Sequence, residues 1–259
     1  MNGLQTLREH ARIIWALMLR ELATRYGRNN IGFLWVIGEP LSFCIGVLIL
    51  WRFIKGPFEN GLGVVAFTLS GYMPTILVRH MVMYSLNAVK MNNGLLYHQQ
   101  IAVLDLFAAR MALECIAVSM GFFLLTLVLL PFGLVPVPVN LRLVYEGWFI
   151  IALTGCGFAL ITGAISEIFE IVERIVGVAL YILVPLSGTF FLADWLPPDA
   201  RRLALLLPFL NCAEMIRAGF FGPAINPHYD AAYATLFGAV MTVVGLLALR
   251  YVRARVEVV

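Results

Sequence analysis

Four charged side chains stand out as candidates for chemistry because they lie inside or at the edge of long apolar runs: Glu39, Arg79, Arg110 and Glu114. A charge at the centre of a bilayer costs about 2.5–3.5 kcal/mol on insertion scales, so we expect each to face protein, water or the membrane surface. A proton relay needs a chain of titratable partners, and the apolar runs offer few. The i, i+4 spacing of Arg110 and Glu114 favours an ion pair within one helix. Glu39 precedes Pro40, which removes a backbone donor and loosens the helix there.

The motifs of common enzyme chemistries are missing from the sequence. Neither Lys55 nor Lys90, the two lysines, completes a G-x-x-x-x-G-K-[ST] phosphate-binding loop, so the chain cannot hydrolyse ATP by that route on its own. Neither Ser70 nor Ser187 lies in a G-x-S-x-G nucleophile elbow. The four histidines and four cysteines are too dispersed for a metal motif or a disulfide framework. We therefore expect no catalytic residue, no metal site and no cofactor in this chain.

Aromatic side chains are the second chemical resource. Seven of them lie at or near the ends of the apolar runs, or on the first, second and fifth run: Phe33, Trp35, Tyr72, Tyr84, Phe190, Phe191 and Trp195. A sugar ring stacks its C–H face on an aromatic ring while its hydroxyls need polar partners, so these residues could line a path for a polysaccharide. Aromatic belts at the membrane surface and ordinary core packing account for the same residues, and the alternatives stay open.

The elements that position these residues are expected to be membrane helices. Hydrophobic residues make up 61% of the 259 residues and charged residues 13%, against about 45–50% and about 25% in soluble domains. Six apolar stretches approach the roughly 20 helical residues that cross a bilayer core of about 30 Å. They are Phe33 to Trp51, Val64 to Tyr84, Met111 to Gly133, Tyr145 to Ile165, Ile175 to Ala193, and Ala231 to Leu249. The sequence therefore predicts an all-α polytopic membrane protein with six transmembrane helices.

The segment before the first span is expected to form a separate unit, residues 1–30, followed by the six-span domain, residues 31–259. Residues 4–28 have the pattern of an amphipathic helix, with these side chains on the apolar face: Leu7, Ala11, Ile14, Trp15, Met18 and Leu22. Such a helix suits the surface of the cytoplasmic leaflet, with its arginines near anionic headgroups. An ordinary cytosolic helix packed on another subunit is the alternative, and both can be true.

Charge distribution predicts that both termini are cytoplasmic. Six spans return the chain to its starting side, and arginines are concentrated in residues 1–30 and in residues 250–255. The bias is imperfect, because six basic residues fall outside on this topology: Arg52, Lys55, Arg142, Arg201, Arg202 and Arg217.

Two loops are long enough to do more than connect spans. Asn87 to Asp105 is the one sizeable cytoplasmic loop expected, and it is either a docking element for a cytoplasmic partner or a plain connector. Ala193 to Asp230 contains apolar pieces that are too short to cross and are interrupted by Pro208. These pieces are expected to be re-entrant helices, which dip into the outer leaflet and return.

Three groups of residues resemble a known family. The run from Arg20 to Pro40 has the order R-E-L…R-Y-G-R…G-F-L-W…E-P, which resembles the start of the membrane subunit of type 2 ABC exporters for bacterial surface polysaccharides, in particular the capsule-polysaccharide export permeases. Two later patterns are similar to the same family: Leu96-Tyr97…Asp105…Arg110…Glu114 and Pro208…Asn211…Glu214…Arg217…Phe220. The resemblance covers most of the chain.

The resemblance implies partners that the residues alone do not show. Such permeases form a homodimer and bind two copies of a separate cytoplasmic ATPase, which holds the ATP and magnesium. The transported molecule is a lipid-linked polysaccharide, and periplasmic and outer-membrane export proteins are further expected partners; no nucleic acid is expected. The protein would reside in the bacterial inner membrane.

The resemblance also assigns roles to residues. Coupling to the ATPase is expected in residues 93–103, and above all at these positions: Asn93, Gly94, Leu95, Leu96, Tyr97, His98, Gln99 and Gln100. The amphipathic helix would be the second contact to the ATPase, and a channel between the protomers would be formed largely by spans one and five. The side chains expected where substrate enters and in the channel are Arg20, Arg25, Tyr26, Arg28, Phe33, Trp35, Glu39, Tyr72, Tyr84, Phe190, Phe191 and Trp195.

Other functions compete with this interpretation. The same architecture could export O-antigen, teichoic acid, another glycan or lipid, or a small hydrophobic drug. A membrane-embedded glycan or lipid transferase would need convergent catalytic side chains, and the sequence supplies no His–Asp or carboxylate cluster. A scaffold that recruits other proteins is a third possibility.

Overall fold

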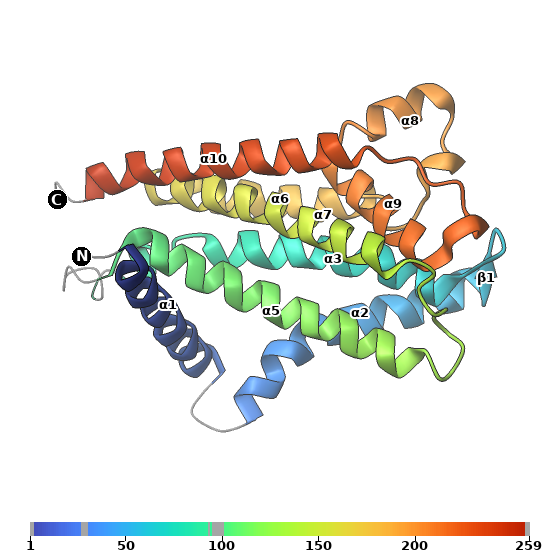
Figure 1. Cartoon of the computed structure of the whole chain (residues 1–259), viewed down its shortest axis with the longest axis horizontal. Coiled ribbons are helices and arrows are strands. Elements are labelled where there is room, and N and C mark those ends of the chain that lie inside the picture. The colour runs from blue at the N-terminus through green and yellow to red at the C-terminus, as the bar shows by residue number, and fades with distance from the viewer. Residues whose placement is uncertain (1–2, 27–30, 93, 95–100, 257–259) are drawn as a thin grey trace.

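Long helices that run roughly side by side form an elongated bundle (Figure 1). The computed structural model describes residues 3–26, 31–92, 94 and 101–256. The long helices of the bundle are α2 (Ile31–Lys55), α3 (Val64–Ser85), α5 (Val103–Leu129), α6 (Leu141–Ile168), α7 (Ile171–Leu186) and α10 (Ala231–Val256). Each of the six apolar stretches predicted from the sequence overlaps one of these helices.

Four of these helices are long and apolar enough to cross a membrane. They are α2, α5, α6 and α10, and a fifth crossing is possible if one bent helix pair is counted as a single span. The all-α architecture with several membrane-crossing helices is therefore confirmed, whereas the number six stays a prediction. The helix α7 has 16 residues, which corresponds to about 24 Å of helix, less than a bilayer core of about 30 Å.

Two helix boundaries differ from the predicted ones for local reasons. The helix α5 begins at Val103 rather than near Met111, because the Asp105 carboxylate accepts a hydrogen bond from the Ala102 N–H (3.3 Å) and closes the first turn. At the other boundary, α7 ends at Leu186, just after Pro185, and Gly188 takes a left-handed conformation with φ of +77°. The chain leaves the helix there, because few residues other than glycine adopt that conformation.

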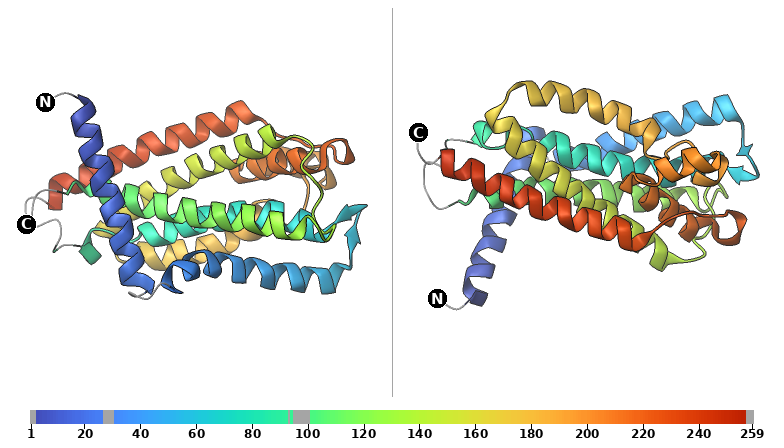
Figure 2. Two further views of the ribbon diagram at one scale, coloured as in Figure 1. Left: turned by 60° about the horizontal axis from the view of Figure 1, so that its bottom comes forward. Right: turned by 90° about the horizontal axis from the view of Figure 1, so that it is seen from above.

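The helix α1 (Gly3–Tyr26) crosses one end of the bundle, at the same end as the C-terminal turns of α10 (Figure 2). It packs on α2 and α5 through a small apolar cluster of its own: Leu17, Met18, Val36, Ala109, Leu113 and Ala117. The predicted apolar face is confirmed at Met18, but Trp15 leaves 60% of its surface exposed. The contact with the bundle therefore uses only one side of the expected face.

Short elements occupy the opposite end of the bundle (Figure 1). The strands β1 (Phe58–Glu59) and β2 (Leu62–Gly63) pair antiparallel around a turn, with Phe58 opposite Gly63. The short helices are η2 (Ala193–Trp195), α8 (Pro198–Ala204), α9 (Pro208–Phe221) and η3 (Gly222–Ala224). Pro198–Ala204 and Pro208–Ala224 meet at 103°, which is a broken span or a re-entrant loop. The geometry fits the predicted re-entrant helices, which stay a prediction.

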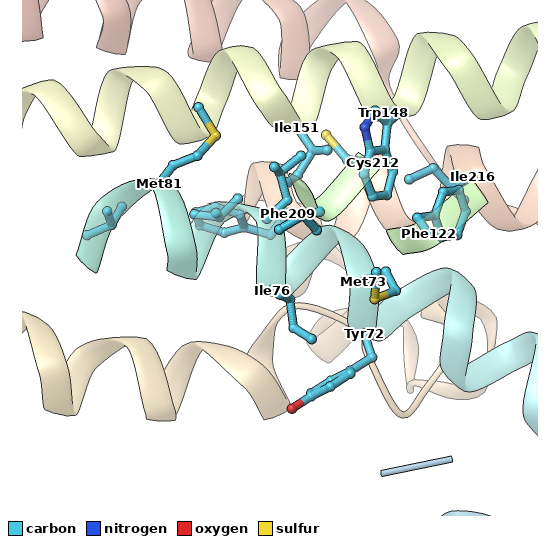
Figure 3. Close-up of a cluster of buried hydrophobic side chains, with 14 of the residues drawn as sticks. Tyr72, Met73, Ile76, Met81, Phe122, Trp148, Ile151, Phe209, Cys212 and Ile216 are labelled. Carbon is cyan, nitrogen blue, oxygen red and sulfur yellow. The ribbon is translucent and has the colours of Figure 1, made fainter. Parts of the chain in front are cut away.

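The main core lies where α3, α5, α6 and α9 meet. Phe122 stacks on Trp148 with ring centroids 4.5 Å apart, and Ile216 of α9 lies beside them in Figure 3. Glycine also allows α6 and α10 to approach each other closely, since a side chain at Gly157 would come within 2.7 Å of Met241. Small residues at such crossings let helix backbones pack closely in a membrane.

Candidate functional site

Charged side chains from three helices meet at the end of the bundle that carries α1. We call this group the α1–α5 polar cluster, and it consists of Glu21, Arg25, His80, Arg110 and Glu114. Little of it is open to solvent, since the Glu114 side chain is 3% exposed and the Arg25 side chain 14%. Buried charges are stable only when they are paired, so the contacts inside the cluster decide how the three helices are held.

Arg25 is the centre of the cluster. Its guanidinium donates to Glu21 of the same helix (Nε to Oε1, 2.9 Å) and to Glu114 of α5, and it lies 3.8 Å from the centroid of the Tyr84 ring. Burial lowers the pKa of Arg25, but the carboxylates of Glu114 and Glu21 outweigh burial and raise the pKa above its usual value. Arg25 therefore carries its charge inside the protein, and two carboxylates compensate that charge.

The other members of the cluster also pair between helices. His80 Nδ1 lies 3.1 Å from Glu114 Oε2. Arg110 Nη1 donates to the Tyr84 carbonyl (3.0 Å), and Arg110 Nε lies 3.3 Å from Glu21 Oε1. Among the ion pairs of the described residues, none joins Arg110 to Glu114, so the predicted pair within one helix is wrong. Both side chains instead contact residues of α1 and α3. The spacing of Arg110 and Glu114 in the sequence does not predict these contacts.

Two further contacts hold α1 in place. His10 Nδ1 lies 2.9 Å from Asp105 at the start of α5. Arg20 Nη1 donates to the Asn92 side-chain oxygen (2.8 Å) at the end of η1, Lys90–Asn92. Arg20, which we expected where substrate enters, thus joins α1 to the segment that leads into the predicted coupling residues.

Glu39 of α2 connects to the cluster through Tyr84. The Tyr84 hydroxyl donates to both carboxylate oxygens of Glu39, at 3.0 and 3.2 Å. The same tyrosine ring lies beneath Arg25. Tyr84 therefore contacts both α1 and α2, in addition to the direct packing of α1 on α2.

The helix α6 holds the other side of the segment after α3. Glu167 accepts hydrogen bonds from the backbone N–H groups of Val89 (2.7 Å) and Lys90 (3.2 Å). Asn87 takes a positive φ of 52° and donates from its side chain to Glu173 of α7 (2.8 Å). The path into the coupling residues is thus fixed by α1 on one side and by the α6–α7 turn on the other.

Most of the predicted coupling residues lie outside the described part of the chain. These are Asn93, Leu95, Leu96, Tyr97, His98, Gln99 and Gln100, while Gly94 is described and exposed. Arg28 also lies outside the described residues. Tyr26 and Phe33 are described as parts of α1 and α2, but their side chains are not. The roles expected for these residues stay predictions.

The predicted aromatic residues lie in different surroundings. Trp35 is 58% exposed on α2, whereas Tyr72 is buried on α3. Phe190 packs on Trp51 with ring centroids 4.4 Å apart, and Trp195 stacks on Phe67 at 5.2 Å. Phe191 contributes its carbonyl, which accepts a hydrogen bond from Arg217 (2.7 Å). A channel role for them stays a prediction.

A second polar site lies at the opposite end, around the fully buried Arg217 of α9. Its guanidinium donates to the carbonyls of Phe191 and Thr189, at 2.7 and 2.8 Å, and lies 3.8 Å from the centroid of the Phe67 ring. Glu214, one turn earlier, accepts from the backbone N–H groups of Ala193 (3.1 Å) and His228 (3.0 Å). Arg217 and Glu214 therefore hold the turn after α7, and Glu214 also holds the loop before α10.

The sequence offered one signal for this site. Glu214 and Arg217 are spaced i, i+3 inside an apolar segment, where charges need partners. Arg217 was expected as an exterior charge and as one residue of the family pattern, and no partner was predicted for it. Its backbone partners come from residues more than 25 positions away, and spacing within α9 cannot identify them.

Three hydroxyl groups pack together beside the segment that Arg217 holds. Thr75, Ser187 and Thr189 lie within 3.1 Å of one another through their side-chain oxygens. Gly71 makes room for the arrangement, since a side chain there would come within 2.5 Å of Arg217 Nη2. The site is filled by the protein's own groups and has a structural character.

The described charged residues contact one another between helices. No group of three or more His, Cys, Asp or Glu side chains that could hold a metal ion occurs among the described residues. The α1–α5 polar cluster is an arrangement of interhelical ion pairs. Together with the membrane-crossing helices, it defines the class: a polytopic helical membrane protein whose charges hold helices together.

Comparison with known proteins gives the family. The chain is 34% identical to the capsule polysaccharide export inner-membrane protein CtrC of Neisseria meningitidis serogroup B, over 93% of this chain and 91% of that protein. It is 32% identical to the capsule polysaccharide export inner-membrane protein BexB of Haemophilus influenzae, over 95% and 93%. It is 24% identical to the polysialic acid transport protein KpsM of Escherichia coli, over 91% of each chain. No protein-family model matches the chain. The chain belongs to the family of capsule polysaccharide export inner-membrane proteins and is an inner-membrane protein.

Proposed function

We propose that this chain is the permease subunit of an ATP-driven exporter, which moves a lipid-linked capsular polysaccharide across the bacterial inner membrane. The observation that carries the proposal is the 34% identity to CtrC over 93% of the chain, because CtrC is named for capsule polysaccharide export. The similarity spans 93% of the chain, so it covers the predicted coupling segment and the bent pair α8–α9 alike.

The energy for export comes from a separate protein in this proposal. Two copies of a cytoplasmic ABC ATPase bind and hydrolyse ATP with magnesium, since this sequence contains no phosphate-binding loop. The ATPase contacts α1 and residues 93–103. The contacts that tie α1 to α5 and to η1, at Arg25, His10 and Arg20, support a mechanical role for this end of the bundle.

The glycan passes between two copies of the chain in this proposal, along a channel formed largely by α2 and α7. Support comes from α7, which the structure describes in full and in which one side chain, Leu180, is buried. Large apolar side chains of α7 are exposed: Ile171, Ile175, Val178, Tyr181, Ile182 and Leu186. A second protomer, lipid tails or the glycolipid can cover such a face.

Six spans with cytoplasmic termini complete the proposed topology. The spans are α2, α3, α5, α6, α7 and α10, with α1 on the cytoplasmic surface and α8–α9 as the re-entrant pair in the outer leaflet. The position of α1 and of the last turns of α10 at one end of the bundle supports an even number of crossings (Figure 1). The α8–α9 end would face the periplasmic and outer-membrane export proteins.

Copurification followed by reconstitution tests the proposal. The tagged chain is purified in detergent from its own bacterium, the bound proteins are identified, and the complex is placed in vesicles with the lipid-linked glycan of that bacterium. We expect an ABC ATPase to copurify, and we expect ATP to drive glycan across the membrane. An ATPase variant whose phosphate-binding lysine is replaced is the matched control and should stop transport.

The other outcomes identify the competing functions. Transport of a glycan that is not capsular, such as O-antigen or teichoic acid, would keep the architecture and correct the substrate. Chemical change of a lipid-linked sugar by the chain without an ATPase would contradict the proposal and indicate a transferase. Tight binding of other proteins without transport or chemistry would indicate a scaffold.

A further inference from the structure

Arg79 is a charged residue in the apolar part of α3, about 9 Å of helix rise from the end of α3 at Ser85. Its side chain is partly exposed, whereas the residues of α3 from Val64 to Val78 are buried. A guanidinium keeps its charge at any physiological pH, so its position requires favourable surroundings.

The protein supplies no acceptor for this charge among its described residues. Arg25, Arg110 and Arg217 all donate to carboxylate or carbonyl oxygens. Arg79 has two described partners: the ring of Tyr181 on α7, whose centroid lies 4.4 Å from the guanidinium carbon, and Tyr72 of the same helix, with which it interacts electrostatically. A cation–π contact uses the face of the guanidinium and leaves its N–H donors available.

The position of Arg79 on α3 places it toward α2 and α7. Tyr72 and Ile76 point to the opposite side of α3 from Phe122, Trp148 and Ile216 (Figure 3). Arg79 follows Tyr72 by seven residues and Ile76 by three, so it shares their face of the helix. The helix α3 contacts α2 and α7, and Arg79 itself contacts Tyr181 of α7. The proposed function assigns α2 and α7 to the channel.

The ring of Tyr181 adds a second recognition element. Tyr181 is 64% exposed, so its ring has surface left for another molecule beside its contact with Arg79. Near one end of this strip, Trp51 at the end of α2 packs on Phe190 after α7 (4.4 Å between ring centroids). Toward the C-terminal end of α3, the side chains of the strip become more exposed, from Arg79 to Met83, which is 40% exposed.

We propose that Arg79 and Tyr181 form a binding site for an acidic sugar of the transported glycan, with the carboxylate on the Arg79 guanidinium and the sugar ring on Tyr181. A guanidinium fork matches a carboxylate with two parallel hydrogen bonds. Among the described residues, Arg79 is the cation in contact with the Tyr181 ring, and one guanidinium suits one negative charge. The inference rests on the proposed function and adds the chemical class of the substrate to it.

The test compares two glycans on the same lipid anchor. One is the lipid-linked glycan of the bacterium, and the other is the same material after its carboxylates are reduced to neutral alcohols. Both are offered to vesicles that contain the complete exporter, and the ratio of their transport rates is measured. We expect the wild type to move the acidic glycan about tenfold faster, the effect of one charge-assisted hydrogen-bonded contact.

Variants of the chain assign this preference to Arg79. The ratio should fall to about one in Arg79→Gln, and most of it should return in Arg79→Lys, which keeps the charge and shows that the complex assembles. The preference should weaken in Tyr181→Leu and persist in Tyr181→Phe. Arg142→Gln is the matched control, because Arg142 is 83% exposed and pairs with Glu146, and it should keep the wild-type ratio.

Several results would overturn the inference. If the ratio of the two transport rates is unchanged in Arg79→Gln, Arg79 does not recognise the carboxylate. This includes the case in which both glycans move equally slowly, because Arg79 then contacts the shared lipid phosphate or only stabilises the fold. A wild-type ratio of one, or a native glycan without carboxylates, would also overturn it while leaving the proposed function intact. A wild-type exporter that moves neither glycan would overturn the proposed function itself.

Discussion

The two ends of the helix bundle bury their charges in different ways. In the α1–α5 polar cluster, the charges pair mostly with side chains, as Arg25 does with Glu21 and Glu114. Arg110 also donates to the Tyr84 carbonyl. At the opposite end, Arg217 pairs with the backbone carbonyls of Phe191 and Thr189. Long side chains can follow a helix that shifts, or exchange partners, whereas a backbone carbonyl moves only with its whole segment. The comparison indicates an adaptable end beside the coupling segment and a fixed end around α9.

The largest effect is expected from removing the fixed arginine. Arg217→Ala removes the guanidinium charge beside the buried Glu214 and leaves two carbonyls without this donor. Breaking a buried charged network in this way costs about 3–5 kcal/mol of stability. Thermal unfolding of the purified protein in detergent measures the loss. The exposed Arg142→Ala is the control, and equal stability of the two variants would show that Arg217 is not the anchor of this end.

A smaller loss of stability is expected from a larger side chain at Gly71, which is closely packed against Arg217 and Thr189. Gly71→Ala would place a methyl group within 2.9 Å of the Thr189 backbone and 2.5 Å of Arg217, and overpacking of this kind costs about 1–3 kcal/mol. Gly177→Ala is the control, because nothing lies within 4 Å of a side chain at that position. The same unfolding measurement compares the two, and an undisturbed Gly71→Ala would mean that the packing around Arg217 gives way easily.

The adaptable end is expected to show coupling between helices. Arg25→Gln and Glu114→Gln each break the interhelical pair, so a double-mutant cycle on unfolding should give an interaction energy of about 0.5–3 kcal/mol. Removing both partners should cost less than the sum of the single losses, because neither charge is then left buried alone. Additive losses would contradict direct pairing of the two residues.

The link from the cluster to α2 is expected to be weaker. Tyr84→Phe keeps the ring under Arg25 but removes the hydroxyl that donates to Glu39, and a lost hydrogen bond of this kind costs about 1 kcal/mol. Glu39→Gln keeps a side chain that can accept the bond and should insert into the membrane normally. If export is unchanged in both variants, the contact between Tyr84 and Glu39 has no part in transport.

The smallest effect is expected at the outer edge of the adaptable end. The His10 side chain is 46% exposed where it meets Asp105, and exposed ion pairs contribute about 0–1 kcal/mol. His10→Gln should therefore unfold within about 1 kcal/mol of the wild type. A loss as large as that of Glu114→Gln would show that α1 is held mainly at its start rather than at Arg25.

The sequence was sufficient to locate the helices but not the contacts between them. Val64 to Tyr84 was predicted as a span and α3 is Val64–Ser85, because a continuous apolar run fixes a membrane helix locally. The partners of Arg110 and Glu114 were predicted wrongly. Their actual partners are on α1 and α3, and only the packing of separate helices brings those residues together. The backbone partners of Arg217 were not predicted, for the same reason.

The resemblance to known permeases identified the family but not the contacts of individual residues. The resemblance gave the family correctly, and the 34% identity to CtrC confirms it. It placed Arg20 and Arg25 where substrate enters, while the structure shows both in contact with other parts of the chain. A role in binding substrate therefore requires that these pairs open during transport. For Arg79, which the resemblance did not single out, the described residues supply a ring contact and no hydrogen-bond acceptor.

The number of glycan chains moved per ATP hydrolysed tests the central claim most directly. It is measured on vesicles that contain the exporter with the wild-type chain or with Arg25→Gln. If the α1–α5 polar cluster transmits the motion of the ATPase, the variant should keep assembling with the ATPase and hydrolysing ATP while it moves severalfold fewer glycan chains for each ATP. An unchanged ratio would contradict the account, because the cluster would then stabilise the fold without taking part in coupling.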